Sequence, residues 1–579
     1  MTVLVFLGMA MLAFGAASRY YSRWLARELG EDSASPTPAC TLADGRDYVP
    51  TKRYVLFAHH FSAIAGAGPI VGPVMAIIYG YVPAWLWILL GGIFIGAVHD
   101  FTSLFITMRE GGKSMAEVAR KTLGPTGFTL FILFTIVMLL LVTSSFLNMV
   151  SISLTSLWPL SKLGLEAGQT LLKTSVVDGV VMGRIGGIAS TSVVIITSLA
   201  PFLGFLIYKK NIPAWVSYPL AAVICVGSIV VGIHFPITLP SKTWTVIISI
   251  YVLFAAGVPV WVILQPRDFI NVQILYAGIG LLLVGLVVAG FMGLPLDMPA
   301  TNLAQGGAKL GFIWPIMFIT IACGAISGFH CLVAGGTTTK QLANECDARR
   351  IGFNAMLLES LLAVCVLLAM GIGLNFKDYL AIVYPEGGVG SNPVLAFSLA
   401  VGRLVHSSLG IRVDLGTVFG VLLVEGFVIT TLDAAVRLNR YLFEELWAIA
   451  FTDPPAFLKN YWFNSGLAVA LMWVLASTNA FQLLWPIFGA SNQLLAALAL
   501  TTITMWLLLR GKKYFFVLVP AIFMIVTTLA SLAILLRSYF LKGKYILVVT
   551  DVLLIALAVA LIYLLISKVR GRTEPSAAA

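Results

Sequence analysis

Long apolar runs separated by short polar segments form the dominant pattern along the chain. A helix needs about 20 consecutive apolar residues to cross the hydrocarbon core of a bilayer. Runs of that kind begin near residues 2, 54, 84, 128, 189, 213, 243, 270, 312, 353, 414, 462, 482, 514 and 545. The pattern therefore predicts an all-α polytopic membrane protein with about 15 transmembrane helices.

The predicted span from residue 54 to residue 81 is interrupted by glycines and prolines. A glycine inside a helix costs about 1 kcal/mol relative to alanine, and a proline lacks the N–H that the helix needs. Unwound backbone survives at membrane depth only where protein buries it or where it lines a cavity. Such a break is typical of a transporter binding site, and we expect it to bind substrate at Ala65, Gly66, Ala67, Gly68 and Pro69.

A second interruption lies in the predicted span from residue 313 to residue 341. The segment Gly324–Gly328 is similar to Ser62–Gly66, and the two spans are predicted to run in opposite directions. Interrupted helices of opposite direction are typical of an inverted-topology repeat. We expect substrate to contact this second break at Ser327, Gly328 and His330. The structural alternative is that these small residues and proline kinks only shape helix packing.

Charge patterning predicts the orientation of the chain. Most Lys and Arg residues fall in loops that are predicted to lie on the same side of the membrane; Lys113 and Lys512 are among them. Lys173 falls in a loop on the opposite side. Cytoplasmic loops are the ones enriched in Lys and Arg, so the N-terminus is expected outside and the C-terminus inside. The segment Pro393–Gly410 is then an external or re-entrant helix, and the loop from Ser18 to Arg53 is expected to be solvated.

Composition narrows the class of protein. Hydrophobic residues make up 59% of the 579 residues and charged residues only 11%, against about 25% charged in soluble domains. The net charge of +11 is explained by the cytoplasmic loops, so no nucleic-acid partner is expected. The six cysteines form no CxxC pair, and no HExxH, GxSxG, P-loop or Rossmann motif occurs. We therefore expect no metal site, no cofactor, no enzyme activity and no ATP-driven transport.

Ionisable side chains inside predicted spans are further candidates, because charge at membrane depth is expensive. The candidates for proton or ion coupling are His59, His60, His99, Asp100 and Asp433. Polar candidates for substrate binding or packing are Glu425, Asn492 and Gln493. Structural alternatives exist for most of them. His59 and His60 would lie at the membrane interface, and Asp100 would pair with Arg109 or with a helix end. Asp433 would pair with Arg437 one turn on, and the amides would join helices. Glu359, near the end of its predicted span, is interpreted as structural.

Four motifs in order resemble the carbon starvation protein (CstA) family, and the resemblance covers about residues 54 to 508. They are His59–Pro73, Gly96–Phe101, Thr430–Arg437 and Phe488–Ala496. The resemblance implies a bacterial cytoplasmic-membrane transporter for peptides, with pyruvate as a substrate of some members. It also implies a leucine-transporter-type inverted repeat with two broken helices plus extra helices. In that fold, the hydroxyls of Thr430 and Thr431 would face the first break and hold a coupling cation.

This fold divides the chain into five parts. They are a first transmembrane helix with a cytoplasmic loop (1–53), a first inverted repeat (54–233), an extra helix pair (234–292), a second inverted repeat (293–508), and C-terminal helices with a tail (509–579). We expect a secondary active importer of a small carboxylate nutrient, coupled to H⁺ or Na⁺, whose partners are that substrate and the lipid bilayer. A membrane nutrient receptor without transport and a channel remain open alternatives, and the sequence predicts no oligomeric state.

Overall fold

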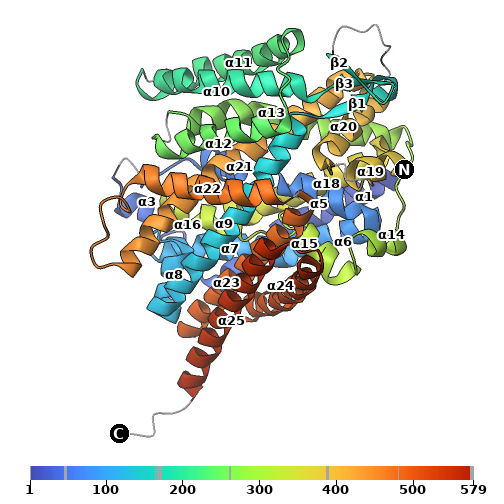
Figure 1. Ribbon diagram of the computed structural model, residues 1–579. Helices are drawn as coiled ribbons and strands as arrows, with labels where there is room; N and C mark the ends of the chain where they lie inside the picture. Colours follow the sequence, from blue (N-terminus) through green and yellow to red (C-terminus); the bar gives the residue numbers. More distant parts are fainter. Residues whose placement is uncertain are drawn as a thin grey trace, which may run out of the picture.

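The protein is a bundle of long helices in a computed structural model that describes residues 2–44, 48–163, 165, 172–210, 212–259, 262–386, 390–479 and 481–573 (Figure 1). Within these ranges, 11 helical runs are long and apolar enough to cross a membrane. They are α1–α2 (Thr2–Leu29, with a π turn at Ala17–Tyr21), α6–α7 (Tyr81–Arg109, with a π turn at Gly92–Gly96), α9 (Pro125–Ser153), α10 (Gly186–Tyr208), α11 (Ala214–His234), α13 (Leu264–Phe291), α17–α18 (Cys346–Gly373), α21 (Val413–Ala450), α23 (Phe481–Leu509), α24 (Phe515–Leu541) and α25 (Tyr545–Thr573).

The first predicted break is present. Helix α4 (Arg53–Ile64) ends at Ile64, and α5 (Gly68–Ala76) begins four residues later, with a bend of 45° between the two half-helices. Counted as one span, this pair gives 12 in the described part of the chain. Pro69 stands in the first turn of α5, where a missing N–H costs nothing.

The second predicted break is also present. A π turn (η5, Ile313–Met317) and α15 (Phe318–Thr320) lead into non-helical backbone, and α16 (Phe329–Gly336) follows it. The predicted number of about 15 spans is not confirmed, because this segment, α12 (Ser241–Gly257) and α22 (Tyr461–Thr478) fall outside the length and hydropathy test. All three are nevertheless helical or partly helical, as their apolar sequences predict.

The two breaks pack directly against each other at the centre of the bundle, near the labels α5 and α15 in Figure 1. A Cβ atom on Gly68 would lie 2.4 Å from the Cys323 side chain, and one on Gly72 would lie 3.0 Å from the Thr320 carbonyl oxygen. Real Cβ atoms do not approach a neighbour as closely as 2.4 Å, so Gly68 is needed for this contact.

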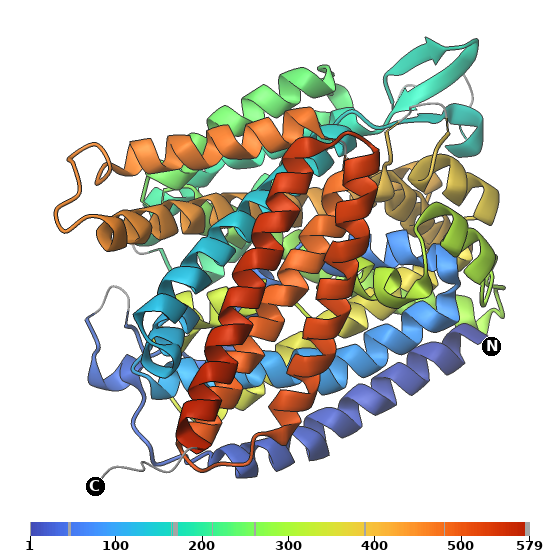
Figure 2. The same cartoon turned by 60° about the horizontal axis from the view of Figure 1, so that its bottom comes forward.

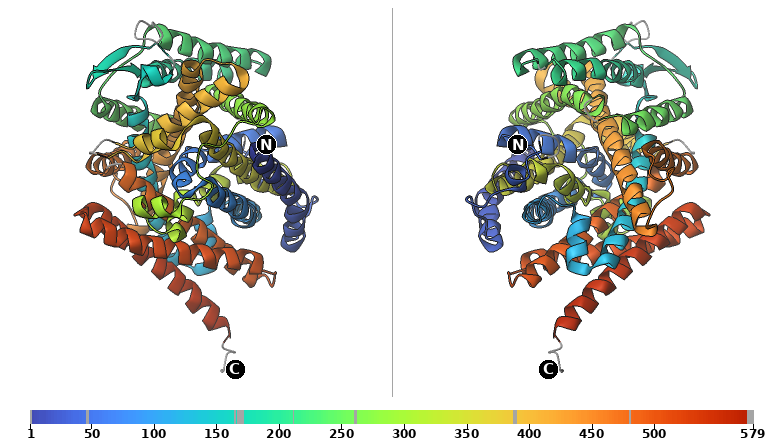
Figure 3. Two further views of the ribbon diagram at one scale, coloured as in Figure 1. Left: turned by 90° about the vertical axis from the view of Figure 1, so that its right-hand side faces the viewer. Right: turned by 90° about the vertical axis from the view of Figure 1, so that its left-hand side faces the viewer.

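The remaining helices form outer layers. The pair α10–α11 lies at one edge of the bundle, at the top of both views in Figure 3, and the hairpin α24–α25 covers another side next to α9 (Figure 2). Shorter helices connect the spans: α3 (Pro38–Thr41), α8 (Met115–Leu123), α14 (Leu303–Lys309), α19 (Phe376–Val383) and α20 (Pro393–Leu409).

A small antiparallel sheet, which the sequence pattern did not predict, lies between α9 and α10. Its strand order is β1–β3–β2, from β1 (Leu157–Pro159), β2 (Thr174–Val177) and β3 (Val180–Arg184). The turn from β2 to β3 uses Asp178 and Gly179, both with positive φ, as a two-residue hairpin turn requires.

The expectation of a solvated loop from Ser18 to Arg53 is wrong for its first part. The helix continues through α2 to Leu29, and Leu25 and Leu29 are buried. Glu31 then pairs with Arg349 at 3.1 Å. The prediction failed because α2 is amphipathic: its charged residues lower the hydropathy of the segment, although one face of the helix is apolar.

Charged groups gather at the two opposite ends of the bundle. At the end that contains α8, Arg109 pairs with Glu345 at 2.6 Å, and Glu110 pairs with Lys121 at 2.7 Å. At the end that contains α19 and the sheet, Lys162 pairs with Asp378 at 2.5 Å (Figure 1). The loops that the charge pattern assigned to opposite sides are therefore on opposite ends of the molecule.

Candidate functional site

Four ionisable side chains form a buried chain beside the second break. The His99 Nδ1 atom lies 2.7 Å from one oxygen of Asp100, and the other Asp100 oxygen lies 2.7 Å from Nδ1 of His330. The Nε2 atom of His330 lies 3.3 Å from an oxygen of Glu359, at ion-pair distance but without hydrogen-bond alignment. All four residues are at most 2% exposed, so the chain is enclosed by protein.

Close helix packing brings these side chains together from α7, α16 and α18. Gly96 stands just before α7, and a Cβ there would lie 2.3 Å from the Ala325 carbonyl oxygen in the second break. A Cβ at Gly352 would lie 3.0 Å from the Asp100 carbonyl oxygen. Small residues at both positions let the backbones approach, and Asp100 thereby reaches the His330 ring.

The structural alternative for Asp100 is wrong. The carboxylate of Asp100 contacts two histidines, whereas Arg109 pairs with Glu345. Glu359, which the sequence analysis interpreted as structural, faces His330 instead and is missing from the predicted site. A single carboxylate inside the apolar run that begins at residue 353 was the signal for it.

The two histidines at the start of the first broken span differ in burial. His60 is buried, and its Nδ1 atom lies 2.8 Å from the hydroxyl of Thr338, beyond α16. His59 is exposed, and its carbonyl accepts a hydrogen bond from Ser62 at 3.0 Å. The interfacial interpretation is therefore wrong for His60.

Helix α23 supplies the polar groups that satisfy the second break. The Asn492 side-chain oxygen accepts from the Phe329 N–H at 3.0 Å, and its amide nitrogen lies 3.1 Å from the Ser327 hydroxyl. Gln493 donates to the carbonyl of Phe318 at 2.7 Å. A Cβ on Gly328 would lie 2.3 Å from the Asn492 carbonyl oxygen. The two amides thus replace helical hydrogen bonds that the break removes, and they join helices as the packing alternative expected.

The first break keeps unpaired backbone donors. Ala65, Ala67 and Gly68 are buried, and within the described ranges no group bonds to the N–H of Ala67 or of Gly68. Buried backbone N–H groups without a partner are rare in native proteins. They lie at the N-terminus of α5, where the helix dipole favours an anion.

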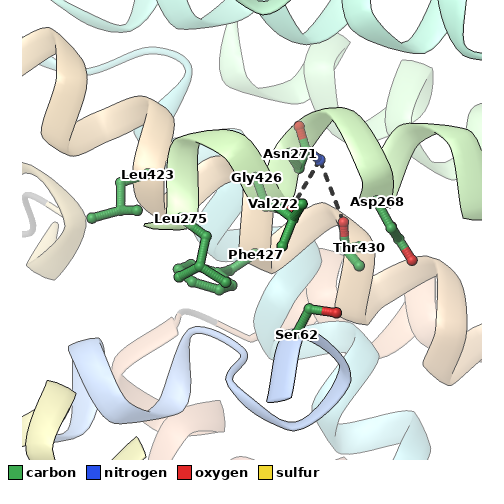
Figure 4. Close-up of a pocket in the computed structure, with 9 residues that line it drawn as sticks. All are labelled: Ser62, Asp268, Asn271, Val272, Leu275, Leu423, Gly426, Phe427 and Thr430. Atoms are coloured by element: carbon green, nitrogen blue, oxygen red, sulfur yellow. Dashed lines mark hydrogen bonds between the residues drawn. The ribbon is translucent and has the colours of Figure 1, made fainter. Parts of the chain in front are cut away.

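Two hydroxyls of α21 face this break, as the resemblance implied. A Cβ on Gly66 would lie 3.0 Å from the Thr431 hydroxyl oxygen. Thr430 lines a pocket with Ser62 of α4 and with Asp268 and Asn271 of α13 (Figure 4). Asn271 donates to the Thr430 hydroxyl at 3.4 Å. The sequence analysis placed α13 outside the repeats and did not include Asp268 or Asn271 among the candidates.

A second buried charge cluster joins α12, α13 and α21. Arg267 forms an ion pair with Asp433, and both contact the hydroxyl of Tyr251. Arg437 instead donates to the carbonyls of Ala255 and Val258. The i,i+4 pair of Asp433 with Arg437 is therefore wrong, because a buried arginine from another helix takes its place.

Glu425 lies in the same helix and is buried, and neither carboxylate oxygen has a hydrogen-bond partner in the described part of the chain. The structure thus keeps Glu425 away from both breaks' hydrogen-bond networks. Within the same ranges, no three His, Cys, Asp or Glu side chains are arranged to hold a metal ion.

Comparison with known proteins identifies the family. The sequence profile of the family described as carbon starvation protein CstA matches residues 2–394 and 387–531. The chain is 33% identical to the pyruvate/proton symporter BtsT of Escherichia coli (strain K12), over 90% of this chain and 80% of that protein. It is 32% identical to the peptide transporter CstA of Bacillus subtilis (strain 168), over 90% of this chain and 88% of that protein.

The similarity to solved structures is weaker than the similarity to these sequences. MhsT in complex with L-phenylalanine aligns with a TM-score of 0.48 at 12% identity, over 88% of this chain and 99% of that chain. A mutant of the Eremococcus coleocola manganese transporter aligns with a TM-score of 0.46 at 14% identity, over 91% and 98%. The assignment therefore rests on sequence, and it is clear: this chain belongs to the carbon starvation protein CstA family.

Proposed function

We propose that the chain is a secondary active transporter that imports a small carboxylate nutrient, a peptide or pyruvate, across the bacterial cytoplasmic membrane. The observation that carries the proposal is the contact between two interrupted helices, one of which holds buried N–H groups without partners. The relatives' names agree with it, since they are peptide transporters and a pyruvate/proton symporter.

The two breaks support a leucine-transporter-type inverted repeat as the finer fold. Each repeat, at 54–233 and 293–508, would begin with one interrupted helix, and the two helices meet at their breaks. The assignment of 234–292 as an extra helix pair is part of this proposal. Both of its helices, α12 and α13, pack against α21, and α10 and α11 of the first repeat lie at the edge of the bundle (Figures 1 and 3).

The substrate carboxylate binds at the first break in this proposal. The free N–H groups of Ala67 and Gly68 and the dipole of α5 would hold it, as helix N-termini hold anions elsewhere. Ser327 and Gly328, which contact Asn492 of α23, would lie on the opposite side of the substrate in this proposal. The equivalent N–H at the start of α16 is already bonded to Asn492, so the first break is the stronger anion site.

Proton coupling is the role that the buried histidine and carboxylate chain supports best. His330 stands between two carboxylates, with Nδ1 toward Asp100 and Nε2 toward Glu359. An imidazole in that position can take a proton at one ring nitrogen and release one from the other. Because both ring nitrogens face carboxylates, we assign His330 to proton transfer in place of direct substrate contact. The rival coupling ion is Na⁺, held by the hydroxyls of Thr430 and Thr431.

Uptake into proteoliposomes tests the proposal. Purified protein would be supplied with radiolabelled pyruvate or a small peptide under an inward proton gradient, a sodium gradient, or neither. We expect accumulation that one gradient drives. Exchange of internal unlabelled for external labelled substrate (counterflow) identifies a carrier, since neither a channel nor a receptor produces it. Absence of both uptake and counterflow for every substrate would refute the transporter assignment.

A further inference from the structure

The pocket beside the first break has a polar end and an apolar end. Figure 4 shows Ser62, Asp268 and Thr430 gathered toward one end and Leu275 and Leu423 at the other. The cavity between these side chains measures about 20 Å³, which is room for a group the size of a water molecule or a small ion. Its walls come from three helices, α4, α13 and α21, and α4 is the half-helix that ends at the first break.

Asp268 is the one ionisable side chain that lines this pocket. No described Lys, Arg or His side chain lies within ion-pair distance of its carboxylate. The adjacent Arg267 directs its guanidinium away, to Asp433 and Tyr251. Asp268 therefore lacks a direct ion-pair partner among the described residues, and the group that hydrogen-bonds to it is the Thr430 hydroxyl.

The neighbouring polar groups present oxygen atoms to the same end. The Ser62 hydroxyl gives its proton to the His59 carbonyl, and the Thr430 hydroxyl accepts from Asn271. Each hydroxyl oxygen keeps an acceptor lone pair, because a hydroxyl has two. A carboxylate flanked by hydroxyl oxygens attracts a positive group, and an unpaired charge at membrane depth is costly without one.

We propose that this pocket binds a singly charged cationic group with Asp268 as its counter-ion. The inference rests on the proposed transport function and adds a recognition site that α13 supplies. Two sources share this chemistry: the ammonium group of a peptide and an inorganic monovalent cation. Either source would lie beside Ser62, on the half-helix that ends at the first break.

Two measurements on the full-length protein distinguish the sources. The first is the thermal unfolding midpoint in detergent, titrated with NaCl or KCl against N-methylglucamine chloride at constant ionic strength. The second is competition for uptake by dialanine and by N-acetyl-dialanine, which lacks the ammonium group. The variant is Asp268→Asn, and the matched control is Asp453→Asn, which removes an exposed carboxylate paired with Lys459 at 2.6 Å.

If an inorganic cation is bound, Na⁺ or K⁺ raises the midpoint of the wild type and of the control, and its apparent affinity falls about tenfold to a hundredfold in Asp268→Asn. If the substrate amine is bound, dialanine competes about tenfold or more better than its acetylated form, and Asp268→Asn removes that preference. Should Asp268→Asn misfold, Thr430→Val removes one oxygen ligand at constant shape and should weaken the same response.

Two results would overturn the cation site. One is a wild type that shows neither a cation response nor an amine preference, and the other is an Asp268→Asn variant that keeps the wild-type response. Uptake of pyruvate or peptide by the same preparation separates the two proposals. Retained uptake with no effect at Asp268 removes only this site, whereas no uptake by the wild type removes the transport function itself.

Discussion

At the scale of single residues, the buried ionisable groups are the most informative part of the molecule. His330 contacts Asp100 at 2.7 Å and Glu359 at 3.3 Å, and none of the three is more than 2% exposed. A carboxylate at membrane depth is costly when it carries an unpaired charge, so each group in this chain constrains the protonation of the next.

Replacing Glu359 by glutamine should uncouple transport. The amide keeps the shape of the carboxylate but can neither accept nor release the proton that His330 would pass. We expect uptake driven by a proton gradient to fall by about a hundredfold or more, the usual lower bound for loss of a proton-transfer group, while counterflow persists. The matched control is Glu386→Gln, an exposed carboxylate paired with Lys309 at 2.9 Å. Gradient-driven uptake equal to that of the control would place the proton path elsewhere.

The ion pair of Arg267 with Asp433 gives a test of stability that is independent of transport. Arg267→Met leaves Asp433 buried without its cation, and breaking one partner of a buried pair costs about 3–5 kcal/mol. The double variant Arg267→Met/Asp433→Leu removes both charges and should regain most of that loss. The coupling energy between the two side chains is obtained from thermal unfolding in detergent of the wild type, Arg267→Met, Asp433→Leu and the double variant. Additive losses in the double variant would show that the two groups do not interact.

At the scale of elements, the two breaks are the feature that the sequence predicted best. Glycine and proline act locally, so the interruptions near Gly66 and Gly328 followed from the chain alone. The partners of the second break could not be predicted from the chain alone. Asn492 and Gln493 lie on a helix far along the chain, and apolar runs that are buried on many sides carry no signal of which neighbours they meet. The same limit hid the contact of α13 with α21, and with it Arg267 and Asp268.

The close contact of the second break with α23 makes a prediction about glycine. A Cβ on Gly328 would lie 2.3 Å from the Asn492 carbonyl oxygen, whereas one on Gly15 in α1 meets nothing within 4 Å. Gly328→Ala must displace α23 or the break, and overpacking of this kind costs about 1–3 kcal/mol. We expect a lower unfolding midpoint and slower uptake for Gly328→Ala. Gly15→Ala should match the wild type in both, and equal behaviour of the two variants would argue against the contact.

At the scale of the whole molecule, the charged groups lie at the two ends of the bundle, as the charge pattern of the sequence predicts. Arg109, Lys121 and Arg510 pair with acids at the end near α8, and Lys162 pairs with Asp378 at the end near the sheet. The N-terminal end of α1 and the C-terminal end of α25 lie at opposite ends of the bundle in Figure 2. We predict that these two ends face opposite sides of the membrane, and the charge pattern predicts which side each of them faces.

Cysteine labelling from each side of the membrane tests that direction. Lys113 and Lys173 are both exposed and lie at opposite ends, so a cysteine at either position is open to a membrane-impermeant maleimide. Cys40 is exposed and Cys346 partly exposed, so both are first replaced by serine to lower the background. Because positively charged loops stay in the cytoplasm, we expect Lys173→Cys to react in intact cells and Lys113→Cys to react only after the membrane is opened. The reverse pattern would invert the orientation and leave the fold intact. Labelling of both positions from one side would contradict the arrangement of the helices themselves.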